Sequence, residues 1–248
     1  MTNNPVALIT GANKGIGHQT AKDLAAHGFT VLVGSRDLDR GLAAAADITG
    51  DAVAVQLDVT DHASVDAAAK RIRREFGRLD VLVNNAGVSF IGDSETPLQE
   101  RASSGLLTQV PLDIARQIYE INVFGVIAIT QALLPLLRET PNARIVNVGS
   151  GGGSLTANAD PSNPHRSMFG VYSASKSALH AVSLAFATAL EPDGINVYTI
   201  DPGMTATSLN NFQGTKTVED GAHHVVEMAL RESGRTGSFT SDEGPVAW

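Results

Sequence analysis

Short and long apolar segments alternate along almost the whole chain, and this alternation constrains the fold more than any other sequence feature. Short β-branched runs predict strands at 6–10, 30–35, 52–59, 79–87, 143–150, 195–200 and 237–242. Helical spacing between them predicts helices at 16–28, 37–48, 63–77, 112–139, 171–190 and 217–232. Most of the strands are apolar at every position, which indicates burial on both faces. The sequence therefore predicts an α/β fold with a parallel sheet between two helix layers.

Length, composition and charge narrow the classes of protein that remain. The 248 residues, 43% of them hydrophobic, contain no linker or low-complexity tract, so we expect one domain over 1–248. With no cysteine, disulfides and thiolate metal sites are excluded, and the net charge of −8 argues against nucleic acid as a partner. The N-terminus lacks a signal-peptide pattern, and no uninterrupted apolar run reaches about 18 residues. We therefore expect no membrane association and a cytoplasmic location.

The first predicted strand runs into a glycine-rich turn, TGANKGIG, at residues 10–17. Glycines let a backbone approach a ligand closely, and the helix that follows directs free N–H groups and its positive dipole end at an anion. The spacing of Gly11, Gly15 and Gly17 is weak evidence alone, because glycine is common in tight turns. Its position at the start of the first strand–helix–strand unit favours a dinucleotide site.

The end of the second strand, GSRD, bears on which dinucleotide binds. An acidic residue there would hold a ribose 2′-hydroxyl, whereas a basic residue accommodates a 2′-phosphate. Ser35 is neutral, and Arg36 and Lys14 supply two cations, which favours NADP(H) over NAD(H). Asp37 fits either an ion pair with Arg36 or a cap on the next helix. The alternative interpretation is that both cations are solvated surface charges.

The stretch GVYSASKSA, residues 170–178, places Tyr172 and Lys176 four positions apart on one helix face. A phenol ordinarily titrates near pH 10, too high for proton exchange close to neutrality. An ammonium about 5 Å away, at an effective dielectric constant near 20, would favour the phenolate by roughly 3 kcal/mol. The pair therefore predicts an acid–base tyrosine, although a buried tyrosine beside a surface lysine is the ordinary alternative.

Several motifs together resemble the short-chain dehydrogenase/reductase family. In order, they are TGANKGIG, NNAG at 84–87, Asn122 in EINVFG, Ser150 after RIVNVG, YSASK at 172–176, and DPGMTAT at 201–207. The resemblance covers nearly the whole chain and is most similar to the carbonyl-reductase-like branch. It implies a Rossmann-type, three-layer, doubly wound fold with about seven parallel strands.

The resemblance also implies a role for four residues in interconverting a ketone or aldehyde and an alcohol. Tyr172 would exchange a proton with the substrate oxygen, and Ser150 would donate a hydrogen bond to that oxygen. Lys176 would lower the pKa of Tyr172 and bond the nicotinamide ribose. Asn122 would hold a water that connects Lys176 to solvent. Two donors directed at one oxygen would stabilise the charge that hydride transfer creates there.

A larger set of positions is implied to bind the cofactor. They are Gly11, Asn13, Gly15, Ile16 and Gly17 in the glycine turn; Lys14, Ser35 and Arg36 near the 2′-phosphate; Asp58 and Val59 near the adenine; Asn85, Ala86 and Gly87 on the adenosine ribose side; Pro202, Gly203, Thr205 and Thr207 around the nicotinamide and diphosphate; and Tyr172 and Lys176 at the nicotinamide.

The chain departs from the family pattern around the substrate. Between Ser150 and Tyr172 lie more residues than is common, so Ser154 is a second candidate for the role of Ser150. We expect segments 88–111, 151–168 and 204–216 to form the substrate site, with Phe90, Phe169, Met204, Leu209 and Phe212 as an apolar wall suited to a hydrophobic carbonyl compound. In the family, the helices at 112–138 and 171–191 often pair between subunits, which favours a homo-oligomer, a dimer or tetramer. The carbonyl-reductase-like branch also has members that an insertion before the tyrosine keeps monomeric, so a monomer is the alternative.

Two other interpretations deserve comparison. A protein that binds NADP(H) without turnover is the alternative function, and such a sensor would usually lack Tyr172 or Lys176. His223 and His224 could suggest a metal, but neighbouring positions on a helix point in different directions. We therefore expect a solvated helix face there, and no metal site.

Overall fold

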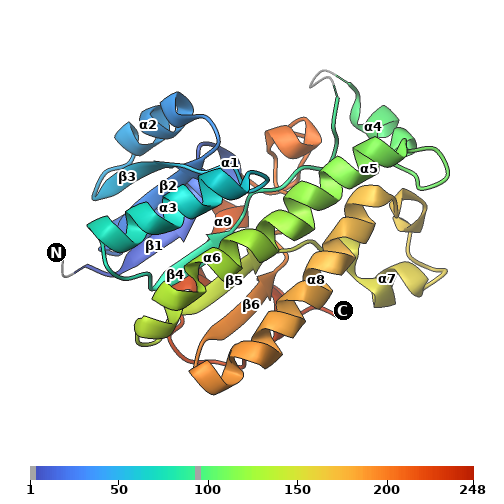
Figure 1. Cartoon of the computed structure of the whole chain (residues 1–248). Helices are drawn as coiled ribbons and strands as arrows, with labels where there is room; N and C mark the ends of the chain where they lie inside the picture. The colour runs from blue at the N-terminus through green and yellow to red at the C-terminus, as the bar shows by residue number, and fades with distance from the viewer. Residues whose placement is uncertain (1–3, 93–95) are drawn as a thin grey trace.

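One eight-stranded sheet forms the centre of the structure, a computed structural model that describes residues 4–92 and 96–248 (Figure 1). The strand order is β3-β2-β1-β4-β5-β6-β7-β8, and all neighbours are parallel except β7 and β8. The strands are β1 (Val6–Ile9), β2 (Thr30–Ser35), β3 (Ala52–Gln56), β4 (Val81–Asn84), β5 (Arg144–Val148), β6 (Asn196–Ile200), β7 (Ser238–Ser241) and β8 (Gly244–Pro245). The predicted doubly wound fold is confirmed, with one short antiparallel strand added at the edge.

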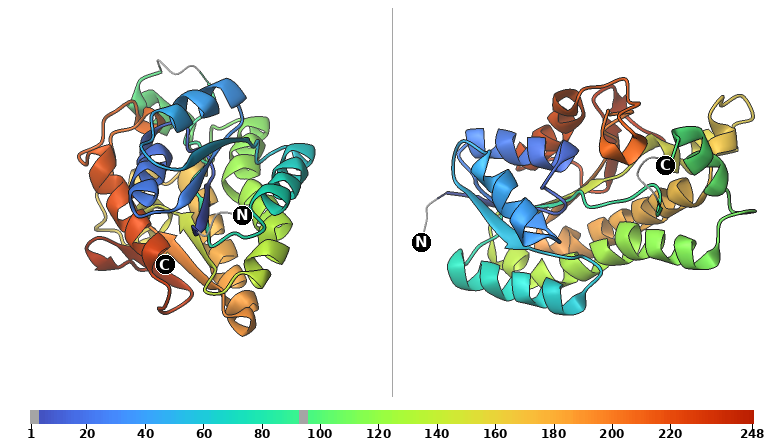
Figure 2. Two further views of the ribbon diagram at one scale, coloured as in Figure 1. Left: turned by 90° about the vertical axis from the view of Figure 1, so that its left-hand side faces the viewer. Right: turned by 90° about the horizontal axis from the view of Figure 1, so that it is seen from above.

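Helices cover both faces of the sheet, as the end-on view in Figure 2 shows. One layer contains α1 (Gly15–Ala26), α2 (Leu38–Ala46) and α9 (Val218–Leu230); the other contains α3 (His62–Glu75), α6 (Gly125–Glu139) and α8 (Val171–Leu190). Alternate residues of β1 enter different cores: Ala7 and Ile9 pack with the first layer, and Val6 and Leu8 with the second. This explains why the strand is apolar at every position.

The predicted helix at 112–139 is continuous in space but contains a change of helical type. It consists of α5 (Leu112–Tyr119), a five-residue π-helical segment η1 (Glu120–Phe124), and α6. Such π-bulges occur frequently at functional sites, and this one contains Asn122. By length and composition alone, Leu112–Glu139 is apolar enough to cross a membrane, a test that buried core helices also pass, and half of the tested window is buried in the fold.

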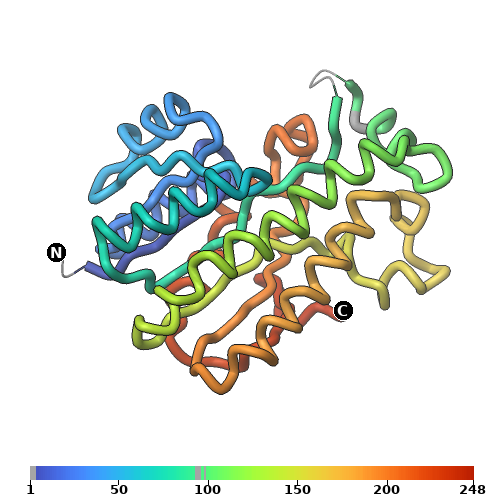
Figure 3. Tube along the Cα trace, viewed as in Figure 1, coloured from blue at the N-terminus to red at the C-terminus, as the bar shows by residue number. Residues whose placement is uncertain are grey.

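The segments expected to be loops contain short helices that the sequence analysis did not predict. Segment 88–111 includes α4 (Leu98–Ser104), and its residues 93–95 lie outside the described part of the chain. Segment 151–168 includes α7 (Leu155–Ala159) and two 3₁₀ turns. The trace in Figure 3 shows both segments, with 204–216, on the side of the molecule away from the N-terminus. They therefore gather around the same end of the sheet.

The strand order reverses direction between β1 and β4, because the chain builds outward from β1 to β3 and then returns to add β4 on the other side. In open α/β sheets, ligands bind outside the carboxyl ends of the strands at such a switch point. The glycine turn follows β1, and Asn85 follows β4. The topology therefore brings these two motifs together.

Candidate active site

The glycine turn is packed too closely for larger residues. Gly11 and Gly15 have φ values of 63° and 58°, in the left-handed region that favours glycine. A Cβ atom at Gly11 would lie 3.0 Å from the Cα of Ala86, and one at Gly17 would overlap the side chain of Asn85. The turn therefore forms a narrow backbone cradle at the N-terminus of α1, the arrangement that suits a phosphate group.

Thr10 joins this cradle to the end of β4. Its hydroxyl oxygen accepts the main-chain N–H groups of Asn85 and Ala86, each at 3.0 Å, and the Asn85 side-chain amide donates to the Thr10 carbonyl at 2.8 Å. The positions predicted for the diphosphate and for the adenosine ribose are thus held side by side. The sequence analysis did not single out Thr10, although it lies directly before the first glycine.

The cations predicted to bind a 2′-phosphate are both exposed. Within residues 4–92 and 96–248, neither the Lys14 nor the Arg36 side chain forms a hydrogen bond or an ion pair with another group. Ser35 is buried and donates to the carbonyl of Asp37 at 2.7 Å. The Asp37 carboxylate caps α2 through the Arg40 amide at 3.1 Å and pairs with the Arg40 side chain at 3.4 Å. Of the two interpretations of Asp37, the structure shows the helix cap.

The residues predicted near the adenine follow β3. The Asp58 carboxylate accepts the main-chain N–H of Thr60 at 2.9 Å and its hydroxyl at 2.7 Å. Val59 packs against Gly125, where a Cβ atom would lie 2.7 Å from a Val59 methyl carbon. The turn after β3 is therefore fixed by its own hydrogen bonds and by the start of α6.

Lys176 lies between the tyrosine and the sheet. It is 4% exposed, its ammonium donates to the Val148 carbonyl at 2.8 Å, and the nitrogen lies 5.9 Å from the centre of the Tyr172 ring. A Cβ atom at Gly87 would lie 3.6 Å from this nitrogen and 3.3 Å from Asn122 Oδ1. Gly87 therefore keeps open the space that these groups share.

Burial dominates the proton equilibria of the pair. Burial raises the pKa of Tyr172 to about 12; the Ser150 hydrogen bond opposes this rise and the charge of Asp201 adds to it. Burial lowers the pKa of Lys176 to about 8. The expectation that Lys176 depresses the pKa of Tyr172 is therefore wrong for the protein alone. The ammonium directs its hydrogen bond to Val148, and the loss of water around the phenol is the largest influence on the pKa of Tyr172.

Of the two candidate serines, Ser150 is the one beside the tyrosine. Its side chain is hydrogen-bonded to Tyr172, and its oxygen also accepts the Gly152 amide at 3.2 Å. Ser154 is buried, caps α7 through the Ala157 amide at 3.1 Å, and donates to the Trp248 carbonyl. The longer segment before Tyr172 thus has its own structural serine.

Asn122 is a fully buried amide bonded to backbone, the ordinary alternative for such a residue. Its oxygen accepts the Val88 N–H at 2.9 Å, and its nitrogen donates to the Val88 carbonyl at 2.8 Å and to Ser175 at 3.0 Å. Ser175 in turn donates to the Tyr172 carbonyl at 2.6 Å. A carbonyl oxygen accepts two hydrogen bonds, so Oδ1 retains one acceptor position beside Gly87.

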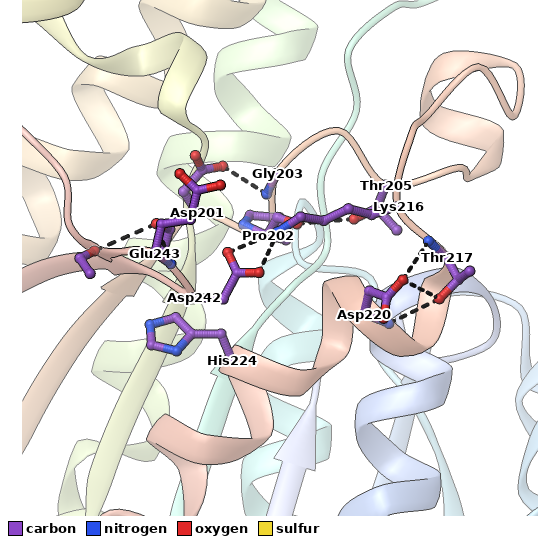
Figure 4. Close-up of polar contacts among 12 residues, drawn as sticks. Asp201, Pro202, Gly203, Thr205, Lys216, Thr217, Asp220, His224, Asp242 and Glu243 are labelled. Atoms are coloured by element: carbon purple, nitrogen blue, oxygen red, sulfur yellow. Dashed lines mark hydrogen bonds and ion pairs between the residues drawn. The ribbon is translucent and has the colours of Figure 1, made fainter.

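The loop after β6 is fastened at both ends (Figure 4). The Gly203 amide donates to the Asp201 carboxylate at 3.0 Å, and the Lys216 ammonium pairs with the Asp242 carboxylate at 2.7 and 2.8 Å. Lys216 lies over Gly203, where a Cβ atom would be 3.1 Å from its nitrogen. A parallel bridge links Thr205 to Lys216. The loop predicted to wrap the nicotinamide and diphosphate therefore carries an ion pair, Lys216 with Asp242, that the sequence analysis did not predict.

This loop also reaches the glycine turn. Thr207 caps a short 3₁₀ helix, and its methyl carbon lies 3.4 Å from the position of a Cβ atom on Gly15. Pro202 stands between Asp201 and Gly203 in the same loop, and its carbonyl accepts the Thr205 hydroxyl at 3.1 Å. The structure thus brings the two predicted diphosphate contacts to one place.

At the rim, segment 88–111 contacts both segment 204–216 and the start of α8, which follows segment 151–168. Ser89 donates to the Leu209 carbonyl at 2.6 Å, Asn211 to the Thr96 carbonyl at 2.8 Å, and the Val171 amide to the Gly105 carbonyl at 2.8 Å. Exposed apolar side chains on these segments include Leu107, Leu155, Met168, Met204 and Phe212. The rim is therefore connected by hydrogen bonds and carries apolar surface.

The two neighbouring histidines on α9 differ in environment, which corrects the expectation of a solvated face. His223 is exposed, whereas His224 is buried, with Nδ1 2.8 Å from Glu227 and Nε2 2.9 Å from Thr240. Both ring nitrogens of His224 are used within the fold. Among the described residues, no group of three side chains is arranged to hold a metal ion.

Comparison with known proteins gives the family. The sequence model of the family described as short chain dehydrogenase matches residues 5–217. A short-chain dehydrogenase of Penicillium roqueforti (strain FM164) is 34% identical, over 98% of this chain and 96% of its own length. Salutaridine reductase of Papaver bracteatum is 32% identical, over 94% and 93%. The chain belongs to the short-chain dehydrogenase/reductase family of oxidoreductases, which confirms the resemblance read from its motifs.

Solved structures agree. Salutaridine reductase from Papaver somniferum superposes with a TM-score of 0.80 at 30% identity, covering 96% of this chain and all of that one. A 3-ketoacyl-(acyl-carrier-protein) reductase from Brucella melitensis, solved with NADH, gives a TM-score of 0.79 at 28% identity and covers 96% of each chain. Sequence and structure comparisons therefore both support the assignment of the fold and the family.

Proposed function

We propose that this protein is an NADP(H)-dependent reductase of ketones or aldehydes, with Tyr172 as its proton donor. The observation that carries the proposal is the cluster at the carboxyl end of β5. The Ser150 side chain bonds Tyr172, and Lys176 lies beneath the tyrosine ring. Two hydroxyl groups therefore meet at one point, as stabilisation of a developing alkoxide requires.

The residues present fit a dinucleotide. The cradle at Gly11 and Gly17 excludes side chains and stands at a helix N-terminus, which suits the diphosphate. The turns at Asn85 and Thr207 border this cradle. When bound, the nicotinamide supplies the hydride, and the remaining chemistry belongs to the protein.

In the reduction that we propose, Tyr172 gives its phenolic proton to the substrate oxygen while Ser150 donates a hydrogen bond to it. Because the phenol of the free protein has a pKa of about 12, it is fully protonated near neutrality and available as an acid. Lys176, beside the ring, stabilises the phenolate that remains. A water on the free acceptor position of Asn122 would return a proton from solvent through Lys176.

Preference for NADP(H) is supported by the Lys14 and Arg36 side chains, which have no partner within residues 4–92 and 96–248. Ser35 adds no charge, and Asp37 is turned toward Arg40 and the start of α2. No carboxylate at the end of β2 is thus left free to receive a ribose 2′-hydroxyl from NAD(H).

The apolar rim supports a hydrophobic carbonyl substrate. Two relatives named for reducing or dehydrogenating small molecules, salutaridine reductase and (+)-neomenthol dehydrogenase, align over 94% and 92% of this chain. The direct test is NADPH oxidation against aldehydes, ketones and diketones, with NADH in parallel. We expect turnover with preference for NADPH. Tight NADPH binding without oxidation by any compound would instead support a sensor.

We also propose that the protein is a cytoplasmic homo-oligomer. Leu112, Phe124 and Leu184 are 65%, 53% and 45% exposed on the helical layer formed by α5, η1, α6 and α8. Such exposed apolar side chains are typical of a surface that a second copy covers. Light scattering coupled to gel filtration tests this, and a monomer at micromolar concentration would contradict it.

A further inference from the structure

His180 lies one helical turn beyond Lys176 on α8 and is 3% exposed. Tyr172, Lys176 and His180 are spaced i, i+4 and i+8, so all three belong to one face of the helix. The main-chain N–H of Ser150 donates to His180 Nε2 at 3.4 Å, a long hydrogen bond. The proposed reaction uses the first two residues of this face and assigns nothing to the third.

The imidazole packs against two glycines, Gly149 and Gly153, that lie on either side of Ser150 in the chain. A Cβ atom at Gly149 would lie 2.7 Å from His180 Nε2, and one at Gly153 would lie 2.9 Å from His180 Cε1. Real Cβ atoms do not approach other atoms so closely, so both positions require glycine: Gly149 because of the ring, and Gly153 because of the ring together with the Cβ and main chain of Lys176. The turn that carries the Ser150 hydroxyl is therefore built around His180.

The surroundings of the ring fix its protonation. Phe239 and Trp248 pack on it with ring centres 4.3 and 5.9 Å away, and within the described residues Nδ1 has no hydrogen-bond partner. Burial, with the charge of Lys176, lowers the pKa of His180 to about 4, so the ring is neutral near neutrality. Since Nε2 accepts from Ser150, the single ring proton resides on Nδ1.

A buried polar nitrogen without a partner is costly, and such groups in folded proteins call for an explanation. Phenylalanine or leucine would fill the same apolar niche against Phe239 and Trp248 without that cost. Only the acceptor at Nε2 distinguishes histidine from these residues at the Ser150 turn. The hydrogen bond from the Ser150 amide to Nε2 is therefore the interaction that histidine provides here and phenylalanine or leucine would not.

We propose that His180 is a positioning residue, whose neutral imidazole accepts the Ser150 main-chain N–H and so holds the Ser150 hydroxyl beside Tyr172. This inference rests on the proposed function of Ser150. The Gly152 amide holds the hydroxyl oxygen from one side, and His180 holds the backbone from the other. Without the acceptor at His180 Nε2, the Ser150 main-chain N–H is left unpaired, and the Ser150 hydroxyl is no longer held in position to donate to the substrate oxygen.

Kinetics of two variants test the role. His180→Phe keeps a ring but loses the acceptor, and we expect kcat to fall roughly 10- to 100-fold while the Kd for NADPH changes less than about twofold. His180→Gln retains an acceptor and should recover most of the loss. Leu179→Ala, a buried neighbour on α8, is the control for destabilisation and should lower Tm without this loss of kcat. Wild-type kcat in His180→Phe, or no recovery in His180→Gln, would overturn the proposal.

A second measurement does not depend on turnover. Nitrogen NMR of the His180 ring should show a neutral imidazole protonated at Nδ1, and the Ser150 amide resonance should shift in His180→Phe. A ring protonated at Nε2 would overturn the hydrogen bond, whatever the activity. If the wild-type protein binds NADPH but reduces no carbonyl, the proposed function fails, and the ring tautomer still decides whether His180 holds Ser150.

Discussion

The Lys176 ammonium donates its hydrogen bond to the Val148 carbonyl at 2.8 Å, and not to Tyr172, whose ring centre is 5.9 Å away. The lysine is thereby fixed at the end of β5, the strand that leads into Ser150. The position of its charge therefore depends on the sheet. Lys176 and Ser150 therefore both lie at the end of β5, beside Tyr172.

Arg36 tests the choice of cofactor. Arg36→Ala should lower kcat/KM for NADPH by about 10-fold and leave that for NADH within about twofold, because only the 2′-phosphate is a partner for the guanidinium. Arg40→Ala is the matched control, since Arg40 is also exposed but pairs with Asp37. Equal losses with both cofactors, or a comparable loss in the control, would show that Arg36 does not read the 2′-phosphate.

A substitution at Asp201 tests how nearby charge sets the pKa of Tyr172. Its charge raises the pKa of Tyr172, so the neutral Asp201→Asn, which keeps an acceptor for the Gly203 amide, should lower that pKa. As the acid form of Tyr172 drives reduction, the alkaline fall of kcat should begin at lower pH in the variant. Ser150, which also acts on the phenol, and Lys176, which lies beside it, both remain unchanged. A pH profile that does not move, or moves upward, contradicts this account.

The ion pair between Lys216 and Asp242 should fix the loop that contains Gly203 and Thr205. Lys216→Met removes the charge but keeps a long apolar side chain over Gly203. We expect the Kd for NADPH to rise about 3- to 10-fold, with Tm nearly unchanged, because a partly exposed pair contributes about 1 kcal/mol or less. Lys70→Met, at an exposed position on α3, is the control. Unchanged cofactor affinity would show that the loop is ordered without this pair.

The two serines before Tyr172 should separate catalysis from stability. Ser150→Ala should lower kcat by roughly 100-fold with little effect on Tm, because it removes a donor to the reacting oxygen. Ser154→Ala should lower the free energy of unfolding by about 1 kcal/mol, since it removes a helix cap, and should keep most of kcat. If Ser154→Ala instead lowers kcat and Ser150→Ala instead lowers Tm, then Ser154 has the catalytic role and Ser150 the structural one.

Much of the fold could be predicted from the sequence because the physical signals are local. The apolar strands and the helical spacing at Leu24 or Ile72 follow directly from which side chains must be buried. The two-residue β8 and the π-helical segment at Asn122 lack such a signal. One is too short for a pattern, and the other differs from an α-helix by a single shifted hydrogen bond.

The site was predictable where motifs carry the chemistry, and less so where packing does. Tyr172, Lys176 and the glycine turn are recognisable once the motifs along the chain are taken together. The pKa of Tyr172 is not, because the desolvation that raises it depends on burial that no spacing reports. His180 stands four positions after Lys176, and Asp201 is the first residue after β6. Neither position indicates a role in the sequence alone, because only the fold brings both residues close to the turn that contains Ser150.

The account depends most directly on Tyr172 as the proton donor. The measurement is the steady-state rate of NADPH oxidation by Tyr172→Phe, with a carbonyl compound that the wild-type protein reduces, alongside the Kd for NADPH. We predict that kcat falls by at least about 100-fold while cofactor binding stays within about twofold, because the ring is kept and only the hydroxyl is lost. A variant that reduces the same compound within a few-fold of the wild-type rate would contradict the account.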